Sequence, residues 1–542
     1  MKKNDEFEIE ITDMSTDGEG IGHADGMAFF VKGAVIGDVI IAGVTKLKKT
    51  YGYARIVRIV KPSPNRVKPA CTVASRCGGC ALQQVSYPAQ LEFKQKKVID
   101  ALTRIGGIDR NRFIFDGDEE TFAADNDGYI NEKDEEYLDG SYAAGICEAT
   151  EKEGNSPGKI RFYNILGMQE PLRYRNKGQF PIGTDKNGNV LCGFYATHSH
   201  DIIDTKTCLL QHDITDALMA AVREYMDECG AGAIRHILTR VGFTTHEVMV
   251  CAVIAADELP HPKRFAELLG NAVDAYNALH ASDYCLNSVS YNINKENTNV
   301  ILGEKVVTIA GLSFITDYIG DIQYQISPLS FYQVNPVQTE ELYATALEFA
   351  APDENDTVWD LYCGIGTISL YFTKYVKKVY GIEIVPQAIE DAIENAKLNG
   401  ITNTEFMCGA AEELFPKLMG DRDGAAEKWF PELMGDSEGV SEEGLPKMID
   451  GDGAAKKPDI VIVDPPRKGC DAKLIECIGN LEPRKIVYVS CDPATLARDI
   501  KLLGGYGYEP LKIRPVDMFP HTVHTEVVTM LVNRNAKKDS WI

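Results

Sequence analysis

The stretch VWDLYCGIGTISL, from Val358 to Leu370, decides how the C-terminal part of the chain folds. An apolar run ends in a loop with two glycines, and a helical pattern follows at once. Gly364 and Gly366 let backbone N–H groups and a helix N-terminus approach a ligand. Dehydrogenases and methyltransferases both use such a loop. The motif alone therefore indicates a nucleotide-like ligand, with a plain turn as the alternative.

Strands and helices alternate after this stretch. VKKVYGIEI has the pattern of a strand, VPQAIEDAIENAKLNG that of a helix, and DIVIVDPP and KIVYVSCD are further buried strands. This rhythm predicts a doubly wound, Rossmann-like α/β domain over residues 329–542, whose strands end at one ligand crevice. Glu383 lies about twenty residues after the glycine loop, where an acid accepts hydrogen bonds from ribose hydroxyls. The alternative for Glu383 is a surface acid.

Two strand ends of this domain carry other polar side chains. Asp464 of DIVIVDPPRKG should face the crevice, and the residue after its Pro-Pro is Arg467 rather than the aromatic that amino-methyltransferases place there. Cys491 of VYVSCDPATLARDI should lie at the same edge, where a thiolate could attack an electrophilic ring carbon. A buried structural cysteine is the alternative.

The segment FPHTVHTEVVTML, from Phe519 to Leu531, precedes the last apolar strand. Glu526 could act there as a general base. His521 and His524 could do the same, although solvated or core histidines are commoner. This motif alone leaves the choice of base open.

The segment CTVASRCGGC brings Cys71, Cys77 and Cys80 into one ten-residue loop. Three thiolates at this spacing suit an iron–sulfur cluster or zinc. A fourth ligand is needed, and its candidates are Cys147, Cys192 and Cys208, of which Cys147 lies in an acidic insertion and is the poorest choice.

The rest of the chain of 542 residues suggests about three domains. Short alternating strands with glycine turns predict a β-barrel over residues 1–62, and residues 63–328 show an α+β pattern. We expect two insertions, an acidic one over 115–160 and a repetitive acidic one over 417–457. No apolar run is long enough for a membrane span and no signal peptide precedes the first strand, so we expect a cytoplasmic protein without a membrane partner.

The net charge of −24 argues at first against a nucleic-acid partner. Much of the negative charge lies in the two insertions, however, while Val39 to Leu91 holds nine Lys and Arg and no acid. A local basic face is what phosphate contacts require. The fourteen cysteines of a cytosolic chain favour thiols, metal binding or catalysis over disulfides.

Taken together, DLYCGIG, DPPRKG, SCDPATLARD and FPHTVHTE resemble the RNA uracil-5-methyltransferase family. The similarity is to the branch with an N-terminal TRAM barrel, which is OB-like, and a 4Fe-4S cluster in its central domain. Known members of this branch methylate 23S ribosomal RNA. A sister branch methylates tRNA and lacks both features. The resemblance therefore implies a 23S rRNA (uracil-5-)-methyltransferase, with a tRNA enzyme and an inactive RNA-binding assembly factor as alternatives.

The resemblance also implies residue roles. Cys491 would be the nucleophile that adds to carbon 6 of uracil, and Glu526 the base that removes the proton from carbon 5. We expect a monomer. The residues expected to bind S-adenosylmethionine are Gln333, Tyr362, Glu383 and Asp464, and those expected to hold the cluster are Cys71, Cys77, Cys80 and Cys208, the last across the acidic insertion.

Overall fold

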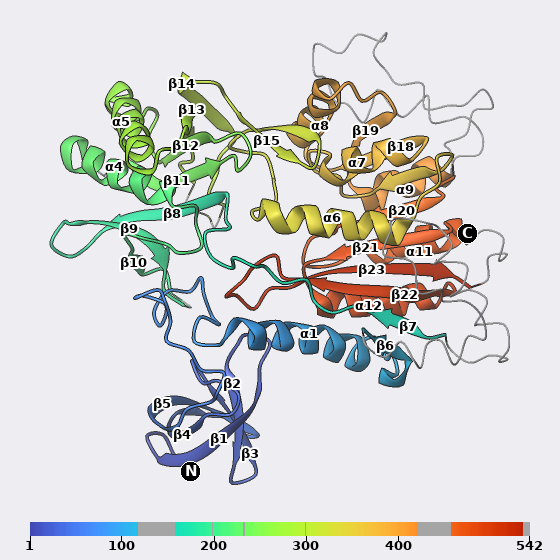
Figure 1. Ribbon diagram of the computed structural model, residues 1–542, viewed down its shortest axis with the longest axis horizontal. Helices are drawn as coiled ribbons and strands as arrows, with labels where there is room; N and C mark the ends of the chain where they lie inside the picture. The colour runs from blue at the N-terminus through green and yellow to red at the C-terminus, as the bar shows by residue number, and fades with distance from the viewer. Residues whose placement is uncertain are drawn as a thin grey trace.

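The computed structural model describes residues 1–116, 158–197, 199–230, 233–296, 298, 300–420 and 457–534. A small barrel lies at one end, and a large α/β domain forms the right-hand side of the molecule (Figure 1). The middle of the sequence forms a sheet with two helices at the upper left, which we call the central body. No helix among these residues is long and apolar enough to cross a bilayer. The predicted insertions fall almost entirely outside the described residues.

The N-terminal body is a closed five-stranded barrel in the order β1-β2-β3-β5-β4. Alternate residues of each strand, such as Ile9 and Ile11, point into its core. Asp38 is buried and accepts hydrogen bonds from Val35 N and Ser63 N, and it pairs with Arg66. These bonds tie the segment after the barrel back to it. The strands are β1 (Glu6–Met14), β2 (Gly20–Ala24), β3 (Met27–Val31), β4 (Val39–Leu47) and β5 (Tyr51–Lys61).

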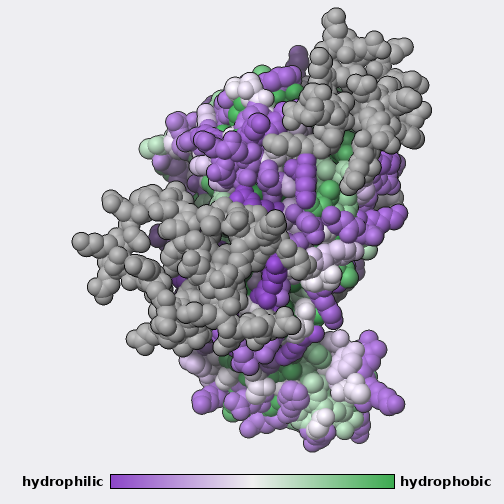
Figure 2. All heavy atoms as spheres, turned by 90° about the vertical axis from the view of Figure 1, so that its right-hand side faces the viewer, coloured by the Kyte–Doolittle hydropathy of each residue, from purple (hydrophilic) through white to green (hydrophobic). Residues whose placement is uncertain are grey.

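The barrel forms the lobe at the lower end of the molecule (Figure 2). Hydrophilic and hydrophobic side chains both lie on its visible face. The lysines and arginines of its last two strands are mostly exposed, among them Lys46, Arg55 and Arg58. The basic stretch predicted from the sequence is therefore available to a partner.

The central body is a seven-stranded sheet in the order β10-β9-β8-β11-β12-β13-β14. Helices α4 and α5 pack together, and both share one apolar core with the sheet. This body has the α+β organisation that the sequence predicts. Its elements are β8 (Lys177–Thr184), β9 (Val190–Tyr195), β10 (Ile202–Asp204), α4 (Ile214–Cys229), β11 (Ile234–Val241), β12 (Glu247–Ile254), α5 (Pro262–His280), β13 (Cys285–Ile293) and β14 (Lys305–Gly311).

The α/β domain is built on a nine-stranded sheet in the order β19-β18-β17-β20-β21-β23-β22-β7-β6. Strands β19 to β21 are parallel, and β23 runs antiparallel to β21. Helices α6, α7 and α8 share the core on one face, while α1, α9, α11 and α12 share the core on the other. The doubly wound fold is thus confirmed.

The strands of this sheet, with the β15–β16 hairpin beside it, are β6 (Phe113–Phe115), β7 (Ile160–Phe162), β15 (Ile315–Ile319), β16 (Ile322–Ile326), β17 (Thr357–Asp360), β18 (Lys378–Glu383), β19 (Thr404–Cys408), β20 (Ile460–Val463), β21 (Lys485–Ser490), β22 (Tyr508–Val516) and β23 (Glu526–Asn533). The helices are α1 (Tyr87–Arg104), α6 (Pro336–Ala350), α7 (Thr367–Phe372), α8 (Pro386–Leu398), α9 (Ala411–Gly420), α11 (Ala472–Leu481) and α12 (Pro493–Gly504), with short 3-10 turns at Arg110–Arg112 and Thr373–Tyr375.

The expected domain boundary at residue 329 does not hold for three elements, α1, β6 and β7. The sequence pattern left them with the central domain, but β7 pairs with β22 at the edge of the α/β sheet and α1 packs against α12. Their apolar side chains, including Leu102 and Phe162, complete the core of that domain. The α/β domain is therefore assembled from two separate parts of the chain.

Candidate active site

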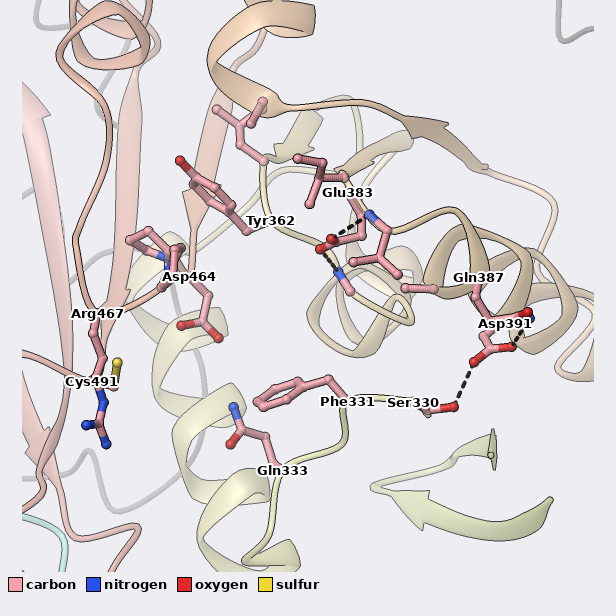
Figure 3. A pocket seen from close by; sticks show the side chains of 18 of the residues that line it. Ser330, Phe331, Gln333, Tyr362, Glu383, Gln387, Asp391, Asp464, Arg467 and Cys491 are labelled. Carbon is pink, nitrogen blue, oxygen red and sulfur yellow. Dashed lines mark hydrogen bonds between the residues drawn. The ribbon is translucent and has the colours of Figure 1, made fainter. Parts of the chain in front are cut away.

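An elongated cavity of about 1080 Å³ opens along the carboxyl ends of the parallel strands. This is the crevice in which doubly wound sheets bind their ligands. Figure 3 shows side chains from several strand ends directed into it. The predicted cofactor and catalytic residues all line this one cavity: Gln333, Tyr362, Glu383, Asp464, Cys491 and Glu526.

One end of the cavity has the geometry of a nucleoside site. Glu383 closes β18, and its two carboxylate oxygens accept hydrogen bonds from Gly364 N at 3.2 Å and Val385 N at 3.0 Å (Figure 3). Gly364 and Gly366 have φ of 55° and 82°, left-handed values that favour glycine. The carboxylate thus fixes the glycine loop while its outer lone pairs remain available to ribose hydroxyls.

The other end of the cavity holds Cys491. Ser490 is the last residue of β21, and Asp492 caps α12 by accepting from Ala494 N at 2.8 Å and Thr495 N at 3.1 Å. The cysteine is therefore the single residue between a buried strand and a capped helix. This local structure fixes the direction of its side chain, which lies beside Arg467 in Figure 3.

Buried carboxyl groups surround the thiol. Burial, together with the carboxyls of Glu526 and Asp464, raises the pKa of Cys491 to about 12, and Arg467 acts in the opposite direction. Burial also raises the pKa of Asp464 to about 7, with a smaller effect from Asp360. The pKa of Glu526 lies well above its usual value for the same reason, with Asp464 adding to the shift. Near neutral pH the thiol is therefore protonated.

Side chains of α12 form hydrogen bonds with the loop that carries Arg467. Asp499 is fully buried and accepts hydrogen bonds from Cys470 N at 2.8 Å and from the Tyr488 hydroxyl at 2.7 Å. Arg498 donates to Lys468 O at 2.9 Å. The end of the motif SCDPATLARD therefore positions the loop of the motif DPPRKG.

The matches to known proteins follow this architecture. The tRNA (Uracil-5-)-methyltransferase family model matches residues 291–426 and 451–534, and the TRAM domain model matches residues 2–57. An uncharacterized RNA methyltransferase of Clostridium tetani is 37% identical over 99% of this chain and 98% of its own. Another from Halalkalibacterium halodurans is 38% identical over the same shares. The chain belongs to the RNA uracil-5-methyltransferase family.

A solved structure from the same family shares the fold. The tRNA (uracil-54, C5)-methyltransferase of Pyrococcus abyssi, in complex with S-adenosyl-L-homocysteine, aligns with a TM-score of 0.63 and 25% identity. The alignment covers 97% of this chain and 99% of the Pyrococcus chain. As a member of this family, the chain has a catalytic domain for S-adenosylmethionine-dependent methylation of RNA uracil at carbon 5.

Three further side chains of this uracil methyltransferase site lie outside the predicted site residues, although the sequence offers one of them, His524, as an alternative base. Phe331 is 66% exposed and its ring projects into the cavity between Gln333 and Asp464 (Figure 3). An exposed aromatic ring in a concave site is suited to stacking on a base. Arg467 and His524 also line the cavity. Burial, together with nearby cations, lowers the pKa of His524 to about 4, so the imidazole is neutral at neutral pH.

Asp464 lies at the reaction end rather than the nucleoside end. Its carboxylate points into the cavity near Gln333 and Phe331, on the same side as Cys491 (Figure 3). The resemblance implies a contact of Asp464 with S-adenosylmethionine. The geometry also makes Asp464 a neighbour of Cys491, the predicted nucleophile.

The four cysteines predicted to hold a cluster lie in one region, but they do not form a metal site in their present geometry. The pKa values of Cys77, Cys80 and Cys208 are raised, chiefly by burial, and the thiols of the group raise one another's values. Within the described ranges, no three His, Cys, Asp or Glu side chains are arranged to hold a metal ion. The cluster is therefore not shown by the geometry, although four thiols share one region.

Proposed function

We propose that this protein methylates carbon 5 of a specific uridine in 23S ribosomal RNA through a covalent adduct of Cys491. The observation that carries the proposal is the gathering of Cys491, Asp464 and Glu526 around one cavity that also has a nucleoside end. S-adenosylmethionine, bound at that end, supplies an electrophilic methyl group. The residues of the chain must supply a nucleophile, a base and a surface for the flipped uracil.

The chemistry begins with the protonated thiol. As sulfur adds to carbon 6 of uracil, the thiol gives its proton to the carboxylate of Asp464, and an enolate forms that is nucleophilic at carbon 5. Carbon 5 then takes the methyl group. Glu526, in its carboxylate form, removes the carbon 5 proton, the bond between sulfur and carbon 6 breaks, and the released thiolate of Cys491 takes back the proton from Asp464, while Glu526 later loses its proton to solvent. Arg467 favours the ionised forms of both Cys491 and Glu526.

The choice of 23S RNA rests on the barrel and the cysteine group. The exposed basic strands of the barrel suit RNA phosphates, as in OB-like barrels. A tRNA substrate is the second candidate, because the Pyrococcus enzyme that acts on tRNA aligns over nearly the whole chain. An inactive RNA-binding assembly factor is the third candidate, and the experiment below distinguishes it from the other two.

We propose further that Cys71, Cys77, Cys80 and Cys208 hold a 4Fe-4S cluster. Backbone N–H groups donate toward the sulfur of Cys77, from Gly79 at 3.4 Å, and toward that of Cys208. Such donors are typical of cluster thiolates, whose negative charge they stabilise.

The test uses purified protein, tritiated S-adenosylmethionine and transcripts of 23S RNA and of tRNA. Wild type should methylate 23S RNA; transfer to tRNA alone would favour the second candidate, and transfer to neither would favour the third. Cys491→Ala should abolish transfer while S-adenosylmethionine still binds, and Glu526→Gln should accumulate a methylated protein–RNA adduct that survives denaturing gels. Cys285→Ala, at an exposed cysteine outside the cavity, is the matched control. Full turnover by Cys491→Ala would reject the mechanism.

A further inference from the structure

Helix α1 presents four polar side chains to the α/β domain from one face. Tyr87, Gln90, Lys94 and Lys97 are spaced by three, four and three residues, the spacing that aligns side chains along one side of a helix. Gln90 and Lys94 are fully buried. Burial of an amide and an amine is unfavourable unless partners are provided. We call these four residues the clamp face.

The partners of the clamp face lie in the loop of residues 517–525, which joins β22 to β23. Lys94 Nζ donates to Asp517 Oδ1 at 2.5 Å and to Phe519 O at 2.9 Å. The Tyr87 hydroxyl donates to Asp517 Oδ2 at 2.9 Å. The Lys94–Asp517 ion pair is fully buried on both sides. The first part of the loop is therefore fixed by two side chains of α1.

The other two residues of the clamp face hold the middle and the end of the loop. Gln90 Oε1 accepts from His521 N at 2.9 Å, and Gln90 Nε2 lies 3.2 Å from His521 Nδ1. Lys97 Nζ donates to Val523 O at 2.9 Å. His521 has φ of 66°, a left-handed conformation that a non-glycine residue keeps where its surroundings hold it.

The loop leads directly into the active site. His524 lies within it, Glu526 follows it as the first residue of β23, and both line the cavity. A displacement of the loop therefore displaces the proposed base. Misplacing a reacting group by about 1 Å can cost roughly a hundredfold in rate.

We propose that Gln90, Lys94 and Lys97 are positioning residues for Glu526. They lie on a helix more than four hundred residues away in sequence and hold the backbone that aims the carboxyl group at the substrate. The inference rests on the proposed function, because the role of Glu526 as base gives the loop its importance. It adds a second requirement to the reaction: α1 must be docked for the proton of carbon 5 to be removed.

The test compares two neighbouring lysines. Lys97→Met removes the bond to Val523 O at 2.9 Å and a longer one to Thr16 O at 3.5 Å. Lys96→Met removes only half-exposed ion pairs with Asp13 and Asp100. Lys97→Met should lower kcat about tenfold, leave KM for RNA unchanged within about twofold, and increase the fraction of enzyme trapped as methylated adduct. Lys97→Arg should restore most of the rate, and Lys96→Met should behave as wild type.

Hydrogen exchange provides a readout that needs no turnover. The His521 amide, which donates to Gln90, should exchange about tenfold faster in Gln90→Met than in wild type. Unchanged exchange in Gln90→Met, or wild-type kcat in Lys97→Met, would overturn the proposal. A wild-type protein that methylates no RNA would reject the proposed function, and the exchange result would still decide whether the clamp face holds the loop.

Discussion

The protonation state of Cys491 in the free protein gives the sharpest test of the site. Burial, with Glu526 and Asp464 beside it, raises the pKa of this thiol from an ordinary 9.0 to about 12. Three pH units correspond to about a thousandfold less thiolate at neutral pH, or about 4 kcal/mol. Cys491 should therefore react slowly with alkylating reagents in the free protein.

The assay is site-specific alkylation by iodoacetamide, followed by mass spectrometry of the peptide that carries Cys491. Because burial also slows the reagent sterically, the pH dependence is informative and the absolute rate is not. The logarithm of the rate should rise with unit slope from pH 7 to pH 10 without reaching a plateau, since only the thiolate reacts. The exposed Cys285 provides a reference for the reagent in the same sample.

Two variants test the causes of the shift separately. Glu526→Gln removes a carboxyl that raises the pKa of Cys491, so the thiol should react faster at each pH. Arg467→Met removes the charge that opposes the shift, so the thiol should react more slowly. A plateau at or below pH 9 in wild type, with the fold intact by circular dichroism, would refute the assignment of a buried, protonated nucleophile.

Three other predictions concern the surroundings of the site. Asp464→Asn should stabilise the protein at pH 8 by about 2–4 kcal/mol in urea unfolding and have little effect near pH 3. The sign follows because the folded pKa of Asp464, about 7, lies above the ordinary value of 3.8, so the wild-type protein loses stability as pH rises through that interval. The same stability difference between variant and wild type at both pH values would contradict this prediction. Asp499→Leu leaves Cys470 N and the Tyr488 hydroxyl without their acceptor, and each orphaned donor costs about 1–3 kcal/mol. Urea unfolding of Asp499→Leu should show a loss of stability of that order, and Asp499→Asn should show a smaller loss. Wild-type stability in Asp499→Leu would show that water replaces the carboxylate. Protein purified without oxygen should contain iron and sulfide and lose both in Cys80→Ser but not in Cys192→Ser; zinc without iron would refute the cluster.

The residues at the carboxyl edge of the sheet were predictable because their positions follow from the local strand pattern. Each of Glu383, Asp464 and Cys491 directly follows or ends a buried parallel strand, and parallel strands in this fold end on the same side. Their convergence on one cavity thus required no knowledge of long-range packing. The identity of the reaction required the motifs together, since each alone left a turn or a core residue as an alternative.

The edge strands β6 and β7 were not predictable in the same way. Each has three residues, too few for a periodic pattern, and they are separated by the acidic insertion. They pair parallel with each other, and β7 pairs with β22, from the other end of the chain. Phe331 was missed for a different reason: nothing in FYQVN distinguishes an exposed aromatic residue in a cavity from one in the core.

The clamp face shows why reactive residues are easier to predict than their positioning. A face of Tyr, Gln, Lys and Lys on a helix would be assigned to solvent by its polarity. Gln90 and Lys94 are instead buried, because Asp517 and the carbonyl and amide groups of the loop satisfy them. The loop in turn lacks the regular structure that would satisfy its own backbone groups. Neither segment is complete without the other, and 423 residues separate the two ends of the Lys94–Asp517 bond. Candidate chemistry can thus be inferred from strand ends, whereas the position of Glu526, the proposed base, depends on contacts that only the folded chain brings together.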